Sequence, residues 1–254
     1  MAVYMISFSP TGGTKKVADC LTKSFGPEIQ EIDLTEVTAD YGRFSFSCDD
    51  ICIVAVPSFG GRVPAPAVSR LSRMTANGAR AVFAVVYGNR AYEDTLLELR
   101  DTLTSAGFRC VAAVAAVAEH SIIHQFASGR PDQKDLEELG QFAHSIKEAM
   151  EKGPSIDKIR VPGNTPYREY HVIPLTPKAG KGCTGCGLCA EKCPVGAIPG
   201  NDPAQTDREI CISCMRCVSL CPAQARTVNK LLLAGAVQKL KKACKEPKKN
   251  ELFL

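Results

Sequence analysis

The sequence has no long hydrophobic run. The longest apolar stretch in residues 1–152 is 111–118, which is far too short to cross a bilayer. The first residues carry neither a positively charged lead nor a small-residue cleavage site, so we expect no signal peptide there. Tryptophan is also absent, which leaves phenylalanine and tyrosine to stack on any bound ring. Together these absences favour a cytoplasmic protein without a membrane span.

Cysteine, by contrast, is abundant. Eight of the 13 cysteines form two copies of the spacing C-x2-C-x2-C-x3-C, each followed by proline. This is the bacterial ferredoxin run, which holds 4Fe–4S clusters through four thiolates each. The copies are Cys183, Cys186, Cys189 and Cys193, then Cys211, Cys214, Cys217 and Cys221. The repeat predicts a protein that moves electrons.

In this motif the fourth cysteine ligates the other cluster. We therefore predict that each motif gives three ligands to one cluster and its last cysteine to the second. The expected sets are Cys183, Cys186, Cys189 and Cys221 for one cluster, and Cys211, Cys214, Cys217 and Cys193 for the other. Zinc or a disulfide framework are weaker alternatives, because of the spacing and the lack of a secretory context. Oxygen-sensitive clusters in a reducing cytoplasm also suggest an anaerobic host.

Charge is unevenly distributed along the chain. Residues 178–254 contain 13 Lys and Arg against 6 Asp and Glu, whereas residues 1–177 contain 18 against 21. The basic excess partly neutralises clusters ligated by thiolates, so we do not read it as a nucleic-acid site. Lysines of the last segment either dock an acidic redox partner protein or form a solvated helix end. They are Lys239, Lys241, Lys242, Lys245, Lys248 and Lys249.

Residues 1–152 alternate apolar strand patterns with helical ones, which predicts an α/β domain with a doubly wound, five-stranded parallel sheet. Strands are expected at 3–8, 28–34, 51–56, 79–87 and 109–118. Helices are expected at 14–25, 64–75, 93–106 and 132–152. Ligands of such folds bind at the carboxyl ends of the strands, where the strand order reverses.

The rest of the chain divides into three segments. Residues 153–181 contain Pro154 and four further prolines, which predicts an extended linker. Residues 182–229 hold both cysteine motifs and form the expected α+β cluster domain, which has little apolar core. Residues 230–254 start as an apolar helix and become a lysine-rich tail.

The loop after the first strand has the composition of an anion site. It reads Ser9-Pro-Thr-Gly-Gly-Thr14 and leads into a helix. Hydroxyls and glycines at a strand-to-helix turn gather backbone N–H groups around an anion, and the helix dipole favours it. Because the P-loop lysine is missing, a terminal monophosphate fits better than a triphosphate. The alternative is an ordinary capped helix after a glycine turn.

This loop resembles the FMN phosphate loop of flavodoxins, and residues 57–62 and 87–92 match by position the two loops that flank the flavin ring there. The resemblance implies phosphate binding by the first loop, a stacking role for Phe59 or Tyr92, and backbone contacts to the ring edge. The implied site residues are Ser9, Thr11, Gly12, Gly13, Thr14, Pro57, Ser58, Phe59, Gly60, Gly61, Tyr87, Gly88, Asn89 and Tyr92. With the cysteine motifs, the chain resembles flavodoxin–ferredoxin fusion proteins of anaerobes.

Three functions remain open at this point. The favoured one is an electron carrier that relays electrons between FMN, two 4Fe–4S clusters and redox partner proteins. The second is an FMN-dependent reductase of a small organic acceptor, fed by the clusters. The third is a regulatory or assembly module that uses its clusters as sensors. The sequence indicates neither the redox potentials nor the oligomeric state.

Overall fold

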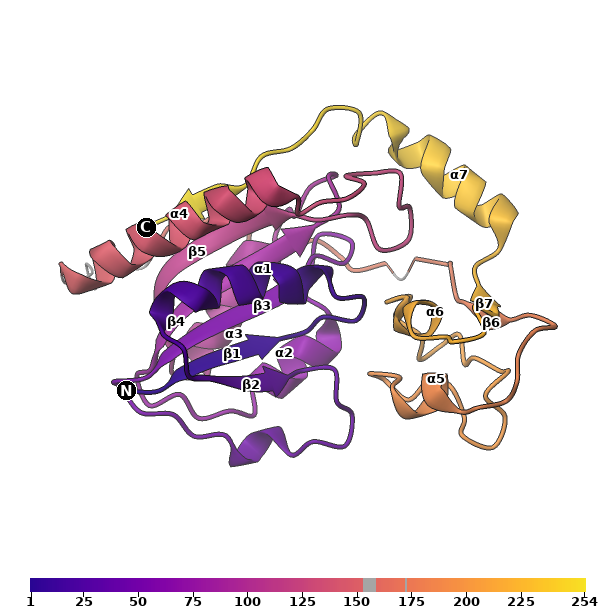
Figure 1. Cartoon of the computed structure of the whole chain (residues 1–254), viewed down its shortest axis with the longest axis horizontal. Helices are drawn as coiled ribbons and strands as arrows, with labels where there is room; N and C mark the ends of the chain where they lie inside the picture. The colour runs from indigo at the N-terminus through magenta and orange to yellow at the C-terminus, as the bar shows by residue number, and fades with distance from the viewer. Residues whose placement is uncertain (153–158, 172) are drawn as a thin grey trace.

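The computed structural model describes residues 1–152, 159–171 and 173–254 (Figure 1). Part of the expected linker, including Pro154, therefore lies outside the described residues. Within the described ranges, no helix is long and apolar enough to cross a bilayer.

The first domain is built on a six-stranded sheet with the order β2-β1-β3-β4-β5-β8. β1 to β5 pair in parallel, and β8 pairs antiparallel with β5. The five parallel strands confirm the predicted flavodoxin-like sheet, whose strand order is 2-1-3-4-5. Their bounds are β1 Val3–Ser7, β2 Ile29–Asp33, β3 Ile51–Pro57, β4 Arg80–Tyr87 and β5 Arg109–Val117.

Helices cover both faces of the sheet, as Figure 1 shows. α1 (Gly13–Thr22) and α4 (Gln133–Glu151) bury apolar side chains against one face, where α1 contributes Val17 and Leu21. α2 (Ala65–Leu71) and α3 (Thr95–Ser105) pack on the opposite face. The 3-10 turns η1 (Lys23–Phe25) and η2 (Tyr41–Arg43) flank β2. Burying a sheet on both sides requires the nearly continuous apolar strands seen in the sequence.

The end of the chain corrects one prediction. We expected residues 230–254 to be a helix and a tail, but β8 (Glu251–Phe253) forms a sixth strand on the edge of β5. Between α7 (Lys230–Lys241) and β8 the chain returns from the cluster module to the first domain (Figure 1). A three-residue strand carries too little pattern to be recognised from sequence.

The cluster module is small and has little regular structure. It contains α5 (Leu188–Glu191), α6 (Arg216–Ser219) and a two-stranded sheet of β6 (Lys178–Ala179) and β7 (Arg226–Thr227). β6 belongs to the segment predicted as linker, so the described part of that segment enters the module. Its earlier residues 159–168 run along the first domain, where the Asn164 N–H donates to Asp94 Oδ1 at 2.8 Å.

Candidate functional site

The eight motif cysteines line two separate small cavities in the cluster module. We call the cysteines around the first cavity the first ring: Cys183, Cys186, Cys189 and Cys221. We call those around the second cavity the second ring: Cys193, Cys211, Cys214 and Cys217. Each ring contains three cysteines of one motif and the fourth cysteine of the other, and the motif spacing predicts the same grouping.

Both motifs adopt the same backbone conformation although their residues differ. In the first motif Gly185 and Gly187 have φ of 69° and 77°. At the corresponding places in the second motif, Ser213 and Met215 have φ of 52° and 62°. A left-handed conformation is unfavourable for side chains such as these and persists only where the surroundings enforce it. A loop held by metal–thiolate bonds is such a setting.

The rings have the donors that an iron–sulfur core requires. Backbone N–H groups point at the sulfurs: Ala197 donates to Cys193 Sγ and Ala225 to Cys221 Sγ, both at 3.3 Å. Burial raises the pKa of Cys214 to about 12, so this thiolate depends on the charge of bound iron. All 13 cysteines lie in the described residues and none forms a disulfide. The rings therefore fit 4Fe–4S cores.

A larger cavity of about 560 Å³ lies at the carboxyl ends of the parallel strands. We call it the sheet-edge cavity. Doubly wound sheets bind their ligands at this edge. Nine of the predicted cofactor residues line it, namely Thr11, Gly13, Thr14, Pro57, Ser58, Phe59, Gly60, Tyr87 and Gly88. Five do not: Ser9, Gly12, Gly61, Asn89 and Tyr92.

The predicted phosphate loop places the start of α1 at this cavity. Gly12 precedes the helix with φ 91° and offers no capping side chain, while Gly13 and Thr14 line the cavity. Ser9 supports the loop from outside the cavity, because its Oγ accepts the N–H of Lys15 at 2.9 Å. The positive end of the α1 dipole thus faces the cavity, as an anion site requires.

Of the two alternative stacking residues that we predicted, Phe59 or Tyr92, only Phe59 lies at the cavity. Phe59 lines the cavity, but Tyr92 is buried and packs edge-on against Tyr87 with 5.1 Å between ring centroids. Tyr170, from the connecting segment, lines the cavity instead. A Cβ placed on Gly60 would lie 3.7 Å from the Tyr170 ring. Phe59, Tyr170 and the buried Tyr87 are therefore the phenylalanine and tyrosine side chains that line the cavity.

Gly61 and Asn89 support the cavity rather than line it. A Cβ on Gly61 would lie 1.9 Å from Glu93 Oε2, so this position admits only glycine while Glu93 stays in place. Asn89 donates to the carbonyl of Cys244 at 2.9 Å and accepts the N–H of Lys248 at 2.8 Å. Its amide thus fixes the returning C-terminal segment, a role that a local loop motif does not indicate.

His120 contributes a neutral imidazole to the cavity. Its Nδ1 accepts the backbone N–H groups of Ile122 and Ile123, both at 3.2 Å. This arrangement assigns the ring proton to Nε2. Burial lowers the pKa of His120 to about 4, so the ring is uncharged at neutral pH.

The depressed pKa makes stability depend on pH. The folded value of about 4 lies below the ordinary 6.5, so the stabilising contribution is full above pH 6.5 and is lost as pH falls toward 4. As the pH falls from 7.5 to 5, we expect His120 to lower the free energy of unfolding by on the order of 2 kcal/mol. Anaerobic urea denaturation of wild type and His120→Asn measures this, since asparagine keeps an acceptor and does not titrate.

The exposed His144 provides the control, because His144→Gln removes a histidine whose side chain is 74% exposed. This variant should retain the wild-type loss of stability at pH 5. An unchanged pH dependence in His120→Asn would contradict the assignment.

Parts of the chain outside the flavodoxin-like loops complete the cavity wall. Ile212, Ser213 and Cys214 of the second motif line it, as do apolar side chains of α7 such as Leu232 and Leu240. Sequence reasoning predicted Cys214 as a cluster ligand but missed its place in this wall, and it missed the other residues altogether. The available signal was the spacing of Leu232, Ala236 and Leu240, which places them on one face of a helix. Cys214 and Ile212 also line the second-ring cavity, so the two cavities adjoin.

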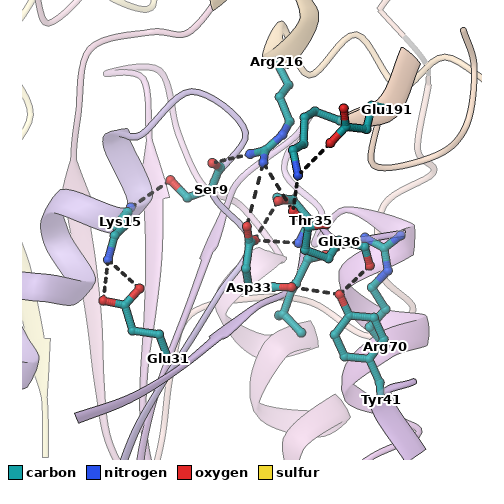
Figure 2. A network of polar contacts seen from close by, with 12 residues as sticks. Ser9, Lys15, Glu31, Asp33, Thr35, Glu36, Tyr41, Arg70, Glu191 and Arg216 are labelled. Atoms are coloured by element: carbon teal, nitrogen blue, oxygen red, sulfur yellow. Dashed lines mark hydrogen bonds and ion pairs between the residues drawn. The ribbon is translucent and has the colours of Figure 1, made fainter. Parts of the chain in front are cut away.

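A polar network attaches the cluster module beside the phosphate loop (Figure 2). Arg216 stands in the sequence between the second-ring cysteines Cys214 and Cys217, and its side chain donates to the Ser9 carbonyl at 3.4 Å. Its Nη2 is 3.8 Å from Asp33 Oδ2 and 4.0 Å from Glu36 Oε1. Lys192 also approaches Glu36, with 3.6 Å between Nζ and Oε1. The basic module thus meets carboxylates of the first domain at this contact.

Arg70 makes a second, buried attachment. Its guanidinium donates to the carbonyl of Leu34 at 2.5 Å and to that of Pro194 at 2.6 Å, and lies 5.5 Å from the centroid of the Tyr41 ring. Pro194 follows the second-ring ligand Cys193 directly. Both attachments therefore fix the second ring, rather than the first, against the flavodoxin-like domain.

Comparison with known proteins identifies the module. Residues 182–230 match the family described as the 4Fe-4S dicluster domain. A 45-residue stretch is 44% identical to one of the subunits of the ion-translocating oxidoreductase complex of Methanosarcina acetivorans and covers 17% of each chain. The match therefore spans only about a sixth of that protein.

Solved flavodoxins are similar to the first domain at low identity. A flavodoxin from Streptococcus pneumoniae is 19% identical with a TM-score of 0.42, covering 58% of this chain and 99% of its own. The FMN-bound flavodoxin of Fusobacterium nucleatum is 11% identical with a TM-score of 0.41, covering 58% and 97%. The description of this domain as flavodoxin-like therefore rests on its strand order and not on these similarities. The chain joins a flavodoxin-like α/β domain to a 4Fe–4S dicluster domain, and this combination of domains is that of a redox protein.

Proposed function

We propose that this chain is an electron-transfer protein that binds FMN in the sheet-edge cavity and one 4Fe–4S cluster in each cysteine ring. The observation that carries the proposal is the shared wall: Cys214 lines both the sheet-edge cavity and the second-ring cavity. Cofactors on the two sides of one cysteine loop can exchange electrons without movement of the module.

The choice of FMN depends on topology and on the phosphate loop. Sheets of order 2-1-3-4-5 bind their ligands at the switch point between β1 and β3, which in flavodoxin is where FMN binds. The sheet-edge cavity includes Thr11 and Thr14 from the loop after β1 and Ser58 from the loop after β3. These hydroxyls, with the N-terminus of α1, suit a monophosphate. The volume of about 560 Å³ lies in the usual range of ligand sites.

Bound FMN supplies a centre that takes two electrons, and cubanes supply centres that take one. The chain contributes position and exclusion of water. Phe59 and Tyr170 are placed to contact the flat ring, and Gly60 presents backbone to it. Apolar side chains of α7, including Leu232 and Leu240, limit access of water to the cavity. Arg70 and Arg216 hold the second ring in place.

The two rings have different positions in this proposal. The second ring adjoins the sheet-edge cavity, so its cluster is the one closer to the FMN site. The first ring does not share its lining residues with that cavity, and its Cys186 is exposed. We therefore assign exchange with redox partner proteins to the first ring. The predicted docking lysines lie elsewhere, around Leu240 in the wall of the sheet-edge cavity, and are a candidate surface for an acidic partner that exchanges electrons there. The exposed ones are Lys239, Lys241, Lys242, Lys245 and Lys249.

A second candidate is an FMN-dependent reductase of a small organic acceptor. It is favoured by the neutral His120, whose Nε2 proton is available to a molecule in the cavity. Anaerobic reoxidation of the reduced flavin separates the two functions. A saturable dependence on a small acceptor indicates the reductase, whereas reoxidation by partner proteins alone indicates the carrier.

The proposal is tested by an anaerobic redox titration of the reconstituted protein, followed by absorption and electron paramagnetic resonance spectroscopy. We expect one flavin and two magnetically interacting cubanes per chain. Clusters without flavin binding, even in excess FMN, would refute the FMN part. Flavin that stays oxidised beside reduced clusters, despite a favourable driving force, would refute the relay.

A further inference from the structure

Arg226 is a buried cation inside the cluster module, and no carboxylate of the described residues pairs with it. Its side chain is among the largest fully buried ones, with the residue 2% exposed. Its guanidinium donates to the carbonyl of Pro203 at 2.6 Å and also to Thr206 Oγ1. Nη1 lies 3.4 Å from Cys189 Sγ of the first ring. Its Nε is buried and, among the described residues, has no partner.

The contacts place Arg226 between the two rings. Arg226 and Pro203 line the first-ring cavity. Thr206 and Pro177, whose oxygens accept from the guanidinium, line the second-ring cavity. The N–H···S contact of 3.4 Å is to Cys189 of the first ring. Burial raises the pKa of the second-ring thiol Cys217, and the Arg226 guanidinium opposes that rise, so it also acts on the second ring. One positive charge therefore lies near both rings and closest to the first.

The equivalent positions after the two cysteine motifs carry different residues. Arg226 lies five residues after Cys221, and the residue five after Cys193 is Ile198. Ile198 is 5% exposed and lines the second-ring cavity, as Arg226 lines the first. The two halves of the module thus place an isoleucine at one ring and an arginine at the other.

A buried cation is costly unless an anion compensates it. Among the described contacts, the acceptors of Arg226 are carbonyls, a hydroxyl and a thiol sulfur, so none carries a full negative charge in the protein alone. A ring of four thiolates around an iron–sulfur core supplies negative charge at this place, and reduction adds more. Hydrogen bonds to the sulfurs and nearby charge set cluster potentials.

We infer that Arg226 is a built-in counter-ion that raises the reduction potential of the first-ring cluster. This inference rests on the two proposed cubanes and is independent of FMN. Arg226 acts through the cluster and its ligand Cys189, so it is a positioning and tuning residue.

Two variants test the role of the charge. Arg226→Ile makes the two halves of the module alike, and Arg226→Lys keeps the positive charge. In an anaerobic titration followed by electron paramagnetic resonance, Arg226→Ile should shift the reduction equilibrium of the first-ring cluster at least about tenfold toward oxidised, or 59 mV for one electron. Arg226→Lys should shift it much less. The first-ring signal is the one lost in Cys186→Ala.

The outcomes are distinguishable. If Arg226→Ile loses its first-ring cluster while Arg226→Lys keeps it at its wild-type potential, this result also shows that the first-ring cluster requires the positive charge at position 226. Equal behaviour of the two variants, whether both unshifted or both without clusters, overturns the inference. A wild-type protein whose iron and sulfide contents exclude two cubanes overturns the proposed function as well, whereas unshifted potentials in fully loaded variants overturn only the role of Arg226.

Discussion

Cys214→Ala is expected to abolish the reduction of FMN by electrons that enter at the first ring. Cys214 is a second-ring ligand and also part of the wall of the sheet-edge cavity. Its loss removes one of the two clusters, so iron and sulfide should fall by about half. Stopped-flow absorbance measures the effect, with a photoreduced ferredoxin as a donor too large to enter the cavity.

Cys186→Ala is the matched control, because it removes a ligand from the exposed first ring. This variant should also lose about half of its iron, but it keeps the second-ring cluster next to the flavin. A donor that reaches the second ring should therefore still reduce the FMN. Flavin reduction at equal rates in both variants would contradict the proposed order of the rings.

Gly88→Ala is expected to be the most damaging small substitution at the sheet-edge cavity. A Cβ at this position would lie 2.7 Å from His120 Cβ, which is fixed to its own backbone and cannot rotate away. The loop after β5 must then shift, and overpacking of this kind costs about 1–3 kcal/mol. Because Gly88 and His120 both line the cavity, FMN affinity should fall together with stability.

The control for this variant is Gly140→Ala in α4. Outside the backbone of α4 itself, no atom of the described residues lies within 4 Å of a Cβ placed there, so alanine should stabilise the helix by about 0.5–1 kcal/mol. Anaerobic thermal denaturation and flavin fluorescence titration measure both variants. Wild-type FMN affinity in a stably folded Gly88→Ala protein would show that this contact does not shape the site.

The sequence was sufficient for the parts of the structure that local pattern encodes. The cysteine spacing specified the grouping of the two rings, because a cubane determines which thiolates can reach it. Continuous apolar strands such as β3 specified a sheet buried on both faces. The turn at Thr11 and Gly12 that leads into α1 was recognisable because a strand-to-helix turn depends only on neighbouring residues.

The parts that could not be predicted depend on contacts between distant residues. Tyr92 and Tyr170 look alike in sequence, but only the fold shows that Tyr92 is buried against Tyr87 while Tyr170 reaches the cavity. The cavity wall formed by α7 and the role of Asn89 depend on the return of the C-terminal segment. Similarly, Arg226 was indistinguishable from other basic residues of the module until its burial was known.

The pairing of β8 with β5 has a mechanical consequence. After the first domain the chain builds the cluster module and comes back to the same sheet at Glu251–Phe253. A body anchored at both ends cannot swing on a single hinge, in contrast to a domain hanging from one linker. Charge passing inside this molecule should therefore be insensitive to the viscosity of the solvent, whereas delivery by a diffusing partner should slow as glycerol is added.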